Sequence, residues 1–156
     1  MLSIISIYQN SIVMKTATTH GSYLKEQAIR LPNYFKTNKS KLTGFETLES
    51  FIAWYMQELN NNGCRCHYCD TSILEIRNLI DDGTVAGRRV RGHGLRGHNF
   101  EIDRKNSELG YIPENCVLSC YFCNNDKSNT FSYITYKYVV GPSRKSVWAE
   151  LTKKHK

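Results

Sequence analysis

The sequence has no run of about 18 apolar residues, so it predicts no membrane-spanning helix. Its apolar opening, residues 1–8, also lacks the basic segment and the cleavage site that mark a secretory leader. We therefore expect a cytoplasmic protein with no membrane partner. Internal repeats and low-complexity tracts are missing as well, and 156 residues are enough for one domain with a buried core.

Acidic residues are few relative to basic ones. Lysine and arginine number 21 against 14 aspartates and glutamates, which gives a formal net charge of +7. The apolar fraction of 40% and the charged fraction of 22% are typical of an ordered globular protein. An excess of positive charge on such a protein favours an anionic partner, either a nucleic acid or a membrane surface.

Most of the six cysteines fall into two close pairs, each with two residues between its members. This spacing lets both sulfurs of a pair face one ion, so the two pairs predict a tetrahedral zinc site that joins distant segments of the chain. Redox chemistry is the alternative, in which Cys64 and Cys116 would cycle between thiol and disulfide. The predicted zinc ligands are Cys66, Cys69, Cys120 and Cys123.

We predict an N-terminal extension, residues 1–42, followed by a single domain, residues 43–156. In the extension, a helix over about residues 21–30 is expected to end before Pro32, because a proline ring clashes with the preceding turn of a helix. The extension contains no motif to which a function can be assigned.

The domain begins with two predicted helices. A capping box at Thr43 and Glu46 predicts the start of the first, and residues 60–63, with the sequence Asn-Asn-Asn-Gly, predict its end. Apolar periodicity predicts a shorter helix from Ser72 to about residue 82. Near the end of the chain, Gly141-Pro142 predicts a break before a basic amphipathic helix.

Residues 84–98 differ from their surroundings because arginines alternate with glycines there. Glycine lets the backbone approach a ligand closely, and arginine binds phosphate through two parallel hydrogen bonds. We interpret this segment as a phosphate clamp that contacts DNA, rather than as an ordinary solvated loop. The predicted DNA-binding residues in it are Arg88, Arg89, Arg91 and Arg96.

Residues 99–130 predict a strand, a loop, a second strand and a helix. Alternation in the first strand sets Asp103 on the face away from the apolar residues. The second cysteine pair turns the chain into the helix, which presents Asn124 in its early turn. Asn115 is suited to brace the loop through its side-chain amide. The predicted fold class is therefore α+β, a zinc-stapled ββα core with flanking helices.

Several short motifs in this stretch match a known family. They are Ile102-Asp103-Arg104, Gly110-Tyr111, Asn115, residues 119–124, and Lys127-Ser128-Asn129. With them, the chain resembles the HNH, or ββα-metal, endonucleases, and it is most similar to their PacI-type branch. The resemblance covers about residues 45–150. It implies an enzyme of homing or restriction type that cleaves phosphodiester bonds in double-stranded DNA, and it suggests a homodimer.

The resemblance also implies roles for individual residues. Asp103 and Asn124 match the ligands of a catalytic ion, and their oxygens suit magnesium, whereas thiolates suit zinc. Arg104 is expected to stabilise charge, Asn115 to brace the catalytic loop, and Lys127 to contact DNA.

The histidines that give the family its name are missing, because Arg104 and Asn124 occupy the matching positions. Three explanations stay open. A tyrosine could attack the phosphate directly, as the PacI-type branch implies; Tyr111 holds the matching position, and Arg104 would favour its phenolate. Alternatively, His93 or His98 could act as the base, although strand parity turns His98 away from Asp103. The third explanation is a zinc-dependent nucleic-acid-binding module without catalysis.

Overall fold

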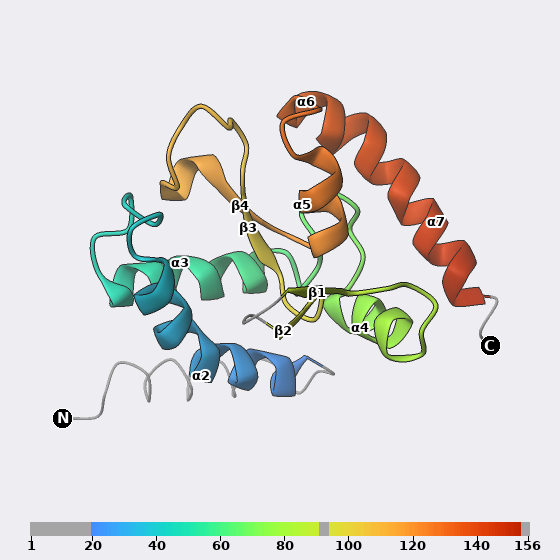
Figure 1. Ribbon diagram of the computed structural model, residues 1–156, viewed down its shortest axis with the longest axis horizontal. Helices are drawn as coiled ribbons and strands as arrows, with labels where there is room; N and C mark the ends of the chain where they lie inside the picture. Colours follow the sequence, from blue (N-terminus) through green and yellow to red (C-terminus); the bar gives the residue numbers. More distant parts are fainter. Residues whose placement is uncertain (1–19, 91–93, 154–156) are drawn as a thin grey trace.

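A hairpin of two short antiparallel strands lies at the centre of the computed structural model, which describes residues 20–90 and 94–153 (Figure 1). Strand β3 spans Glu101–Arg104 and β4 spans Cys116–Ser119, with Asp103 opposite Val117. Helix α5, Tyr121–Lys127, follows β4 directly and packs on β3. This β3–β4–α5 unit confirms the predicted α+β fold with a ββα core.

Helices α2, Gly21–Asn38, and α3, Leu48–Asn61, pack together on one side of the hairpin. The prediction that the first helix ends before Pro32 is wrong, because α2 continues for 18 residues through that proline. Leu31 and Phe35 are buried on either side of it, so tertiary packing outweighs the local cost of proline. Residues 21–38 of the predicted extension therefore share the core of the domain.

Helix α3 begins later than its predicted capping box. Thr47 is the N-cap, and the reciprocal bonds of the box run between Thr47 and Ser50. Gly44 lies in a loop pressed against the loop between β3 and β4, where an added Cβ would be 2.7 Å from the carbonyl oxygen of Tyr111. That contact holds Thr43 and Gly44 outside the helix, so the prediction of a cap at Thr43 is wrong.

Helix α4, Ile73–Asp81, confirms the predicted short helix. Ser72 caps it and Glu75 closes the capping box, while Gly83 follows its end with a φ of +80°. A second small hairpin comes next, in which β1, Arg88–Val90, pairs with β2, Gly94–Arg96. The short 3-10 helix η1, Pro113–Asn115, leads into β4.

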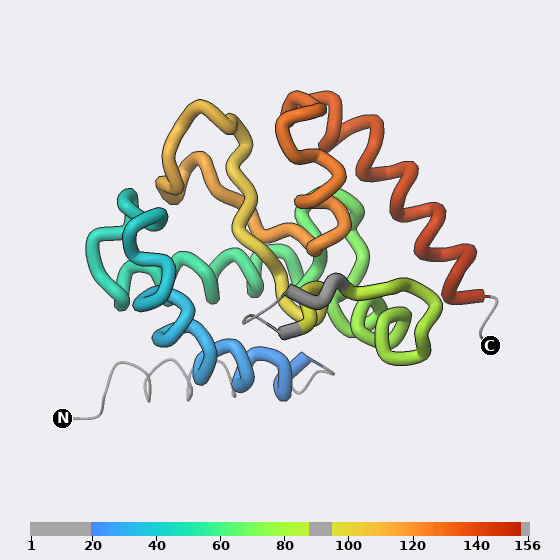
Figure 2. The backbone as a smooth tube through the Cα atoms, viewed as in Figure 1, coloured from blue at the N-terminus to red at the C-terminus, as the bar shows by residue number. Residues whose placement is uncertain are grey.

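The tail is continuous, as Figure 2 shows for the segment that runs past α5 and back towards α4. Helix α6, Tyr133–Thr135, passes through a π-helical turn η2, Tyr136–Val140, into α7, Gly141–Lys153. The predicted break at Gly141 is therefore wrong. The wider π turn precedes Pro142, and such a turn accommodates a residue that lacks an N–H donor.

Among residues 20–90 and 94–153, no helix is both long enough and apolar enough to cross a bilayer. The buried core instead draws on every layer of the ββα unit and its helices. Phe51 contributes most to the aromatic part, with Phe35 and Phe45 at ring-centroid distances of 5.2 and 5.3 Å.

Candidate active site and metal centres

The four cysteines of the two pairs meet at one point. Their sulfur atoms all lie within 4.8 Å of one another, and all four side chains are buried as free thiols. Cys66 Sγ accepts a hydrogen bond from the backbone N–H of Cys120 at 3.3 Å. Cys120 Sγ accepts one from Cys123 N–H at 3.4 Å. Such bonds stabilise thiolates, and four thiolates at this separation suit a tetrahedral zinc ion. The predicted grouping is confirmed.

This cluster joins the first cysteine pair to the end of β4. The backbone N–H of His67 donates to the carbonyl of Leu118 at 3.0 Å, which aligns the residues between Cys66 and Cys69 with the strand. Tyr68 lies in that short segment, so a metal in the cluster would fix its place relative to β3. Only 3% of Tyr68 is exposed.

Tyr68 contacts the central carboxylate of the hairpin. Its hydroxyl donates to Asp103 Oδ2 at 2.5 Å. Its ring packs edge-on against Tyr136 at 5.0 Å, and an added Cβ at Gly141 would meet the Tyr68 carbonyl. Burial raises the pKa of Tyr68 above the usual range of a phenol, and the charge of Asp103 raises it further. A cation beside Asp103 would oppose that second effect.

Lys127 supplies one such cation. Its Nζ lies 3.1 Å from Asp103 Oδ2 and donates to the carbonyl of Arg104 at 2.9 Å. The side chain is 1% exposed. The expected DNA contact of Lys127 therefore needs correction, because helix α5 directs this ammonium into the protein, where it neutralises Asp103.

The predicted metal ligand on α5 contacts a different carboxylate. Asn124 Nδ2 donates to Glu101 Oε2 at 2.7 Å, and within the described part of the chain its Oδ1 accepts no hydrogen bond. Arg96 forms a two-pronged ion pair with Glu101 at 2.7 and 2.6 Å and stacks on Tyr121 at 4.7 Å. The Arg96 guanidinium is thus engaged beside Asn124, on the same strand face as Asp103.

The loop between β3 and β4 is held by Asn115, as the brace hypothesis requires. Asn115 Oδ1 accepts from the N–H of Asn106 at 2.9 Å, and its Nδ2 donates to the carbonyls of Asn106 and Gly110, both at 3.0 Å. The braced loop carries Tyr111, whose ring lies 4.9 Å from the Arg104 guanidinium. Tyr111 forms no hydrogen bond or ion pair with Asp103.

The remaining predicted site residues make no described contact with Asp103. His98 Nε2 pairs with Asp81 at 2.6 Å, away from Asp103, so the geometry gives it no role as the base. Arg91 and His93 lie outside the described residues. Arg88 and Arg89 lie in β1, where their backbones pair with Arg96 and Leu95 of β2.

Tyr68 and Glu101 are the two site residues that the sequence reasoning missed. A signal for Tyr68 existed, because a side chain between two zinc ligands is held in a fixed position. The signal for Glu101 was its alternation with Asp103 in β3, which sets both carboxylates on one face.

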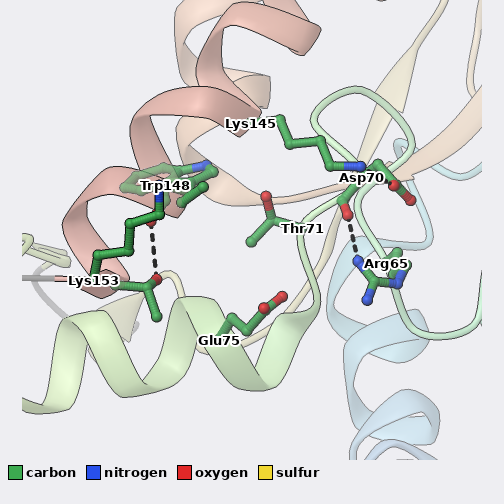
Figure 3. A pocket seen from close by; sticks show the side chains of 9 residues that line it. Arg65, Asp70, Thr71, Glu75, Lys145, Trp148 and Lys153 are labelled. Atoms are coloured by element: carbon green, nitrogen blue, oxygen red, sulfur yellow. Dashed lines mark hydrogen bonds and ion pairs between the residues drawn. The ribbon is translucent and has the colours of Figure 1, made fainter. Parts of the chain in front are cut away.

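A cavity of about 190 Å³ between α4 and α7 lies apart from this site (Figure 3). Its lining includes the cations Arg65, Lys145 and Lys153 and the carboxylates Asp70 and Glu75; Lys145 pairs with Asp70 at 2.5 Å, and Arg65 donates to the Asp70 backbone carbonyl at 2.6 Å. The Lys145–Asp70 ion pair thus links α7 to the residue that follows the first cysteine pair.

Comparisons with known proteins agree with this geometry. No family model matches the sequence, and no curated protein matches it. Among solved structures, the chain is similar to the rare-cutting HNH restriction endonuclease PacI, with a TM-score of 0.57 and 26% sequence identity over 87% of each chain. The resemblance read from the motifs is therefore confirmed: in both fold and sequence, the chain is similar to an HNH restriction endonuclease.

Proposed function

We propose that the protein is a metal-dependent endonuclease that cleaves phosphodiester bonds in double-stranded DNA. The observation that carries the proposal is the contact of a buried carboxylate, Asp103, with a tyrosine hydroxyl and a lysine ammonium on a ββα scaffold. Similarity to an HNH restriction endonuclease supports the substrate class. We also propose a homodimer, since one such site per chain would cut one strand.

The proposed protein ligands of a magnesium ion are the side-chain oxygens of Asp103 and Asn124. Among the described residues, the four cysteines are the only group of three or more His, Cys, Asp or Glu side chains placed to hold a metal. The proposed magnesium site is therefore not enclosed by protein ligands alone. Magnesium is commonly bound by one or two protein oxygens together with substrate phosphate, here Asp103 Oδ and the uncommitted Oδ1 of Asn124. An ion held there would supply charge neutralisation on the phosphate and on the leaving oxygen.

Two tyrosines compete for the role of nucleophile. Tyr111 was the sequence-based candidate, and the Arg104 guanidinium lies 4.9 Å from its ring. The Tyr68 hydroxyl touches the carboxylate that would hold the ion, which would bring it close to a phosphate bound to that ion. We therefore favour Tyr68. Attack by either phenol oxygen would form a phosphotyrosine bond, break the bond between phosphorus and one sugar oxygen, and leave the phenolic proton for that sugar oxygen.

The proposed function is tested by incubating zinc-loaded protein with supercoiled plasmid, with magnesium and without it. We expect nicked or linear products only with magnesium, because the charge on the phosphate must be neutralised. Gel electrophoresis measures the products, and conversion straight to linear plasmid would support paired sites. Binding of plasmid without any cleavage would instead favour the rival function, a non-catalytic nucleic-acid-binding module.

The nucleophile is tested by two matched variants. Tyr68→Phe is expected to lower the cleavage rate at least about a hundredfold, because it removes the attacking oxygen, whereas Tyr111→Phe is expected to stay within about threefold of wild type. Tyr68→Phe also loses a buried hydrogen bond to a charged group, at a cost of about 1.5–3 kcal/mol, so thermal melting must show that the variant is folded.

A covalent intermediate provides a second readout of the same chemistry. Wild-type protein quenched in denaturant should leave protein on the DNA end, which a protease then removes. Loss of both cleavage and adduct in Tyr111→Phe alone would assign the role to Tyr111. Full activity in both variants would show that water attacks.

A further inference from the structure

One face of helix α2 lines a cleft of about 580 Å³. The residues on it recur at intervals of three and four, the spacing that places side chains on one side of a helix. The opposite stripe of α2 is buried in the core. The cleft-lining residues from α2 and the segment that follows it are Arg30, Asn33, Tyr34, Thr37, Asn38 and Lys41.

The other end of the cleft borders the candidate active site through two of its residues. Glu101 and Asn124 line it there, together with Tyr111 from the loop that Asn115 braces. A ligand lying along α2 would therefore reach the Oδ1 of Asn124. Asp103 itself does not line the cleft, so the predicted extension is placed beside Glu101 and Asn124.

The charge of the cleft is positive. Its lining includes three cations, Arg30, Lys41 and Arg96. It includes a single carboxylate, Glu101, which already pairs with Arg96. Arg30 is also engaged, donating to Gln27 and Tyr55 at 2.8 and 3.1 Å. Lys41 is exposed and makes no ion pair among residues 20–90 and 94–153, so its ammonium is available to a ligand.

The chemistry of the other lining groups suits a nucleic-acid strand. Asn33 is exposed, and its side chain has no partner within the described part of the chain; an asparagine amide matches a base edge or a sugar oxygen. Tyr34 and Tyr111 also line the cleft, but guanidinium groups already lie over their rings, that of Arg30 at 5.0 Å and that of Arg104 at 4.9 Å. Acidic side chains are nearly absent from residues 21–42, where Glu26 is the single acid and pairs with Arg77 at 2.7 Å.

We propose that this cleft holds the DNA strand next to the scissile phosphate, with Lys41 contacting a backbone phosphate and Asn33 the adjoining nucleotide. The inference rests on the proposed function, since it takes DNA as the substrate and Asp103 as the place of cleavage. It assigns a substrate-binding role to α2 and to the residues that directly follow it.

Two matched variants test the assignment. Lys41→Ala removes a cation that lines the cleft, and Lys36→Ala removes an exposed cation of α2 that does not line it. Binding to a fluorescent duplex of mixed sequence is measured over a series of salt concentrations, without magnesium or chelator, so that no DNA is cut and zinc stays bound.

Lys41→Ala is expected to lower the affinity about threefold or more and to reduce the slope of log K against log salt by about 0.9, the effect of one lost phosphate contact. Lys36→Ala should match wild type in both quantities. Asn33→Ala should weaken binding without a change of slope, because it removes no charge. Thermal melting of each variant checks the fold.

The outcomes separate this inference from the proposed function. If wild type cuts plasmid and Lys41→Ala binds with the affinity and slope of Lys36→Ala, the cleft assignment is overturned and the nuclease stands. If wild type neither binds the duplex nor cuts plasmid, both are overturned. If Lys41→Ala shows the expected change but no protein cuts DNA, the cleft stands as a DNA site on a protein that does not cleave.

Discussion

Asp103→Ala is expected to lower DNA cleavage at least about a thousandfold, more than the loss of a single hydrogen-bond donor in an active site. The carboxylate lies on the strand face that α5 covers, in contact with Tyr68 and Lys127. Its removal takes away the proposed ion ligand and the group that positions the Tyr68 hydroxyl. Plasmid cleavage under single-turnover conditions measures the loss.

The same substitution is expected to destabilise the fold. It leaves the Lys127 ammonium, 1% exposed, without its counter-charge, and breaking a buried ion pair in this way costs about 3–5 kcal/mol. A loss of cleavage could therefore reflect unfolding alone. Asp103→Ala combined with Lys127→Met removes both charges and should recover most of the melting temperature.

That double variant makes the prediction decisive. If it is as stable as wild type and still does not cut, the Asp103 carboxylate is required for the chemistry. If it cuts at a rate close to that of wild type, the proposed ion site is wrong and Glu101 becomes the candidate, since it faces Asn124 at 2.7 Å. Asp103→Asn, which keeps the shape of the side chain, serves as a further control.

Removal of zinc is expected to have the largest effect on stability. Four buried sulfurs within 4.8 Å of one another repel as thiolates unless a metal neutralises them. We expect a loss of at least about 5 kcal/mol, which for a chain of this size lowers Tm by about 10–20 °C. Cys69→Ser should reproduce the effect, and native mass spectrometry should show its zinc missing.

Cys64 provides the matched control. It is buried but lies outside the cluster, and burial raises its pKa to about 11. Burial likewise raises the pKa of Cys116 to about 12. Because the thiolate is the reactive form, both should resist alkylation at neutral pH in the folded protein. If the Cys64→Ser variant still binds zinc, the four-cysteine zinc cluster is supported. A disulfide between Cys64 and Cys116 in the native protein would support the redox alternative.

The local patterns were enough to predict the ββα unit and the cysteine cluster. Two-residue spacing brings thiols to one ion wherever the pairs meet, and alternation fixes the face of Asp103 once residues 101–104 form a strand. The cap at Ser72 and the amide of Asn115 act on backbone groups a few residues away. Such short-range interactions do not depend on the rest of the fold.

The tertiary structure decided the interactions between residues far apart in sequence. Tyr68 and Asp103 are separated by 35 positions, and the cysteine cluster brings them into contact. Burial of Leu31 and Phe35 keeps α2 helical through Pro32. The direction of α5 sends Lys127 into the protein. In each case the free energy of packing distant segments exceeds a local preference of about 1–3 kcal/mol, which a pattern of neighbouring residues does not report.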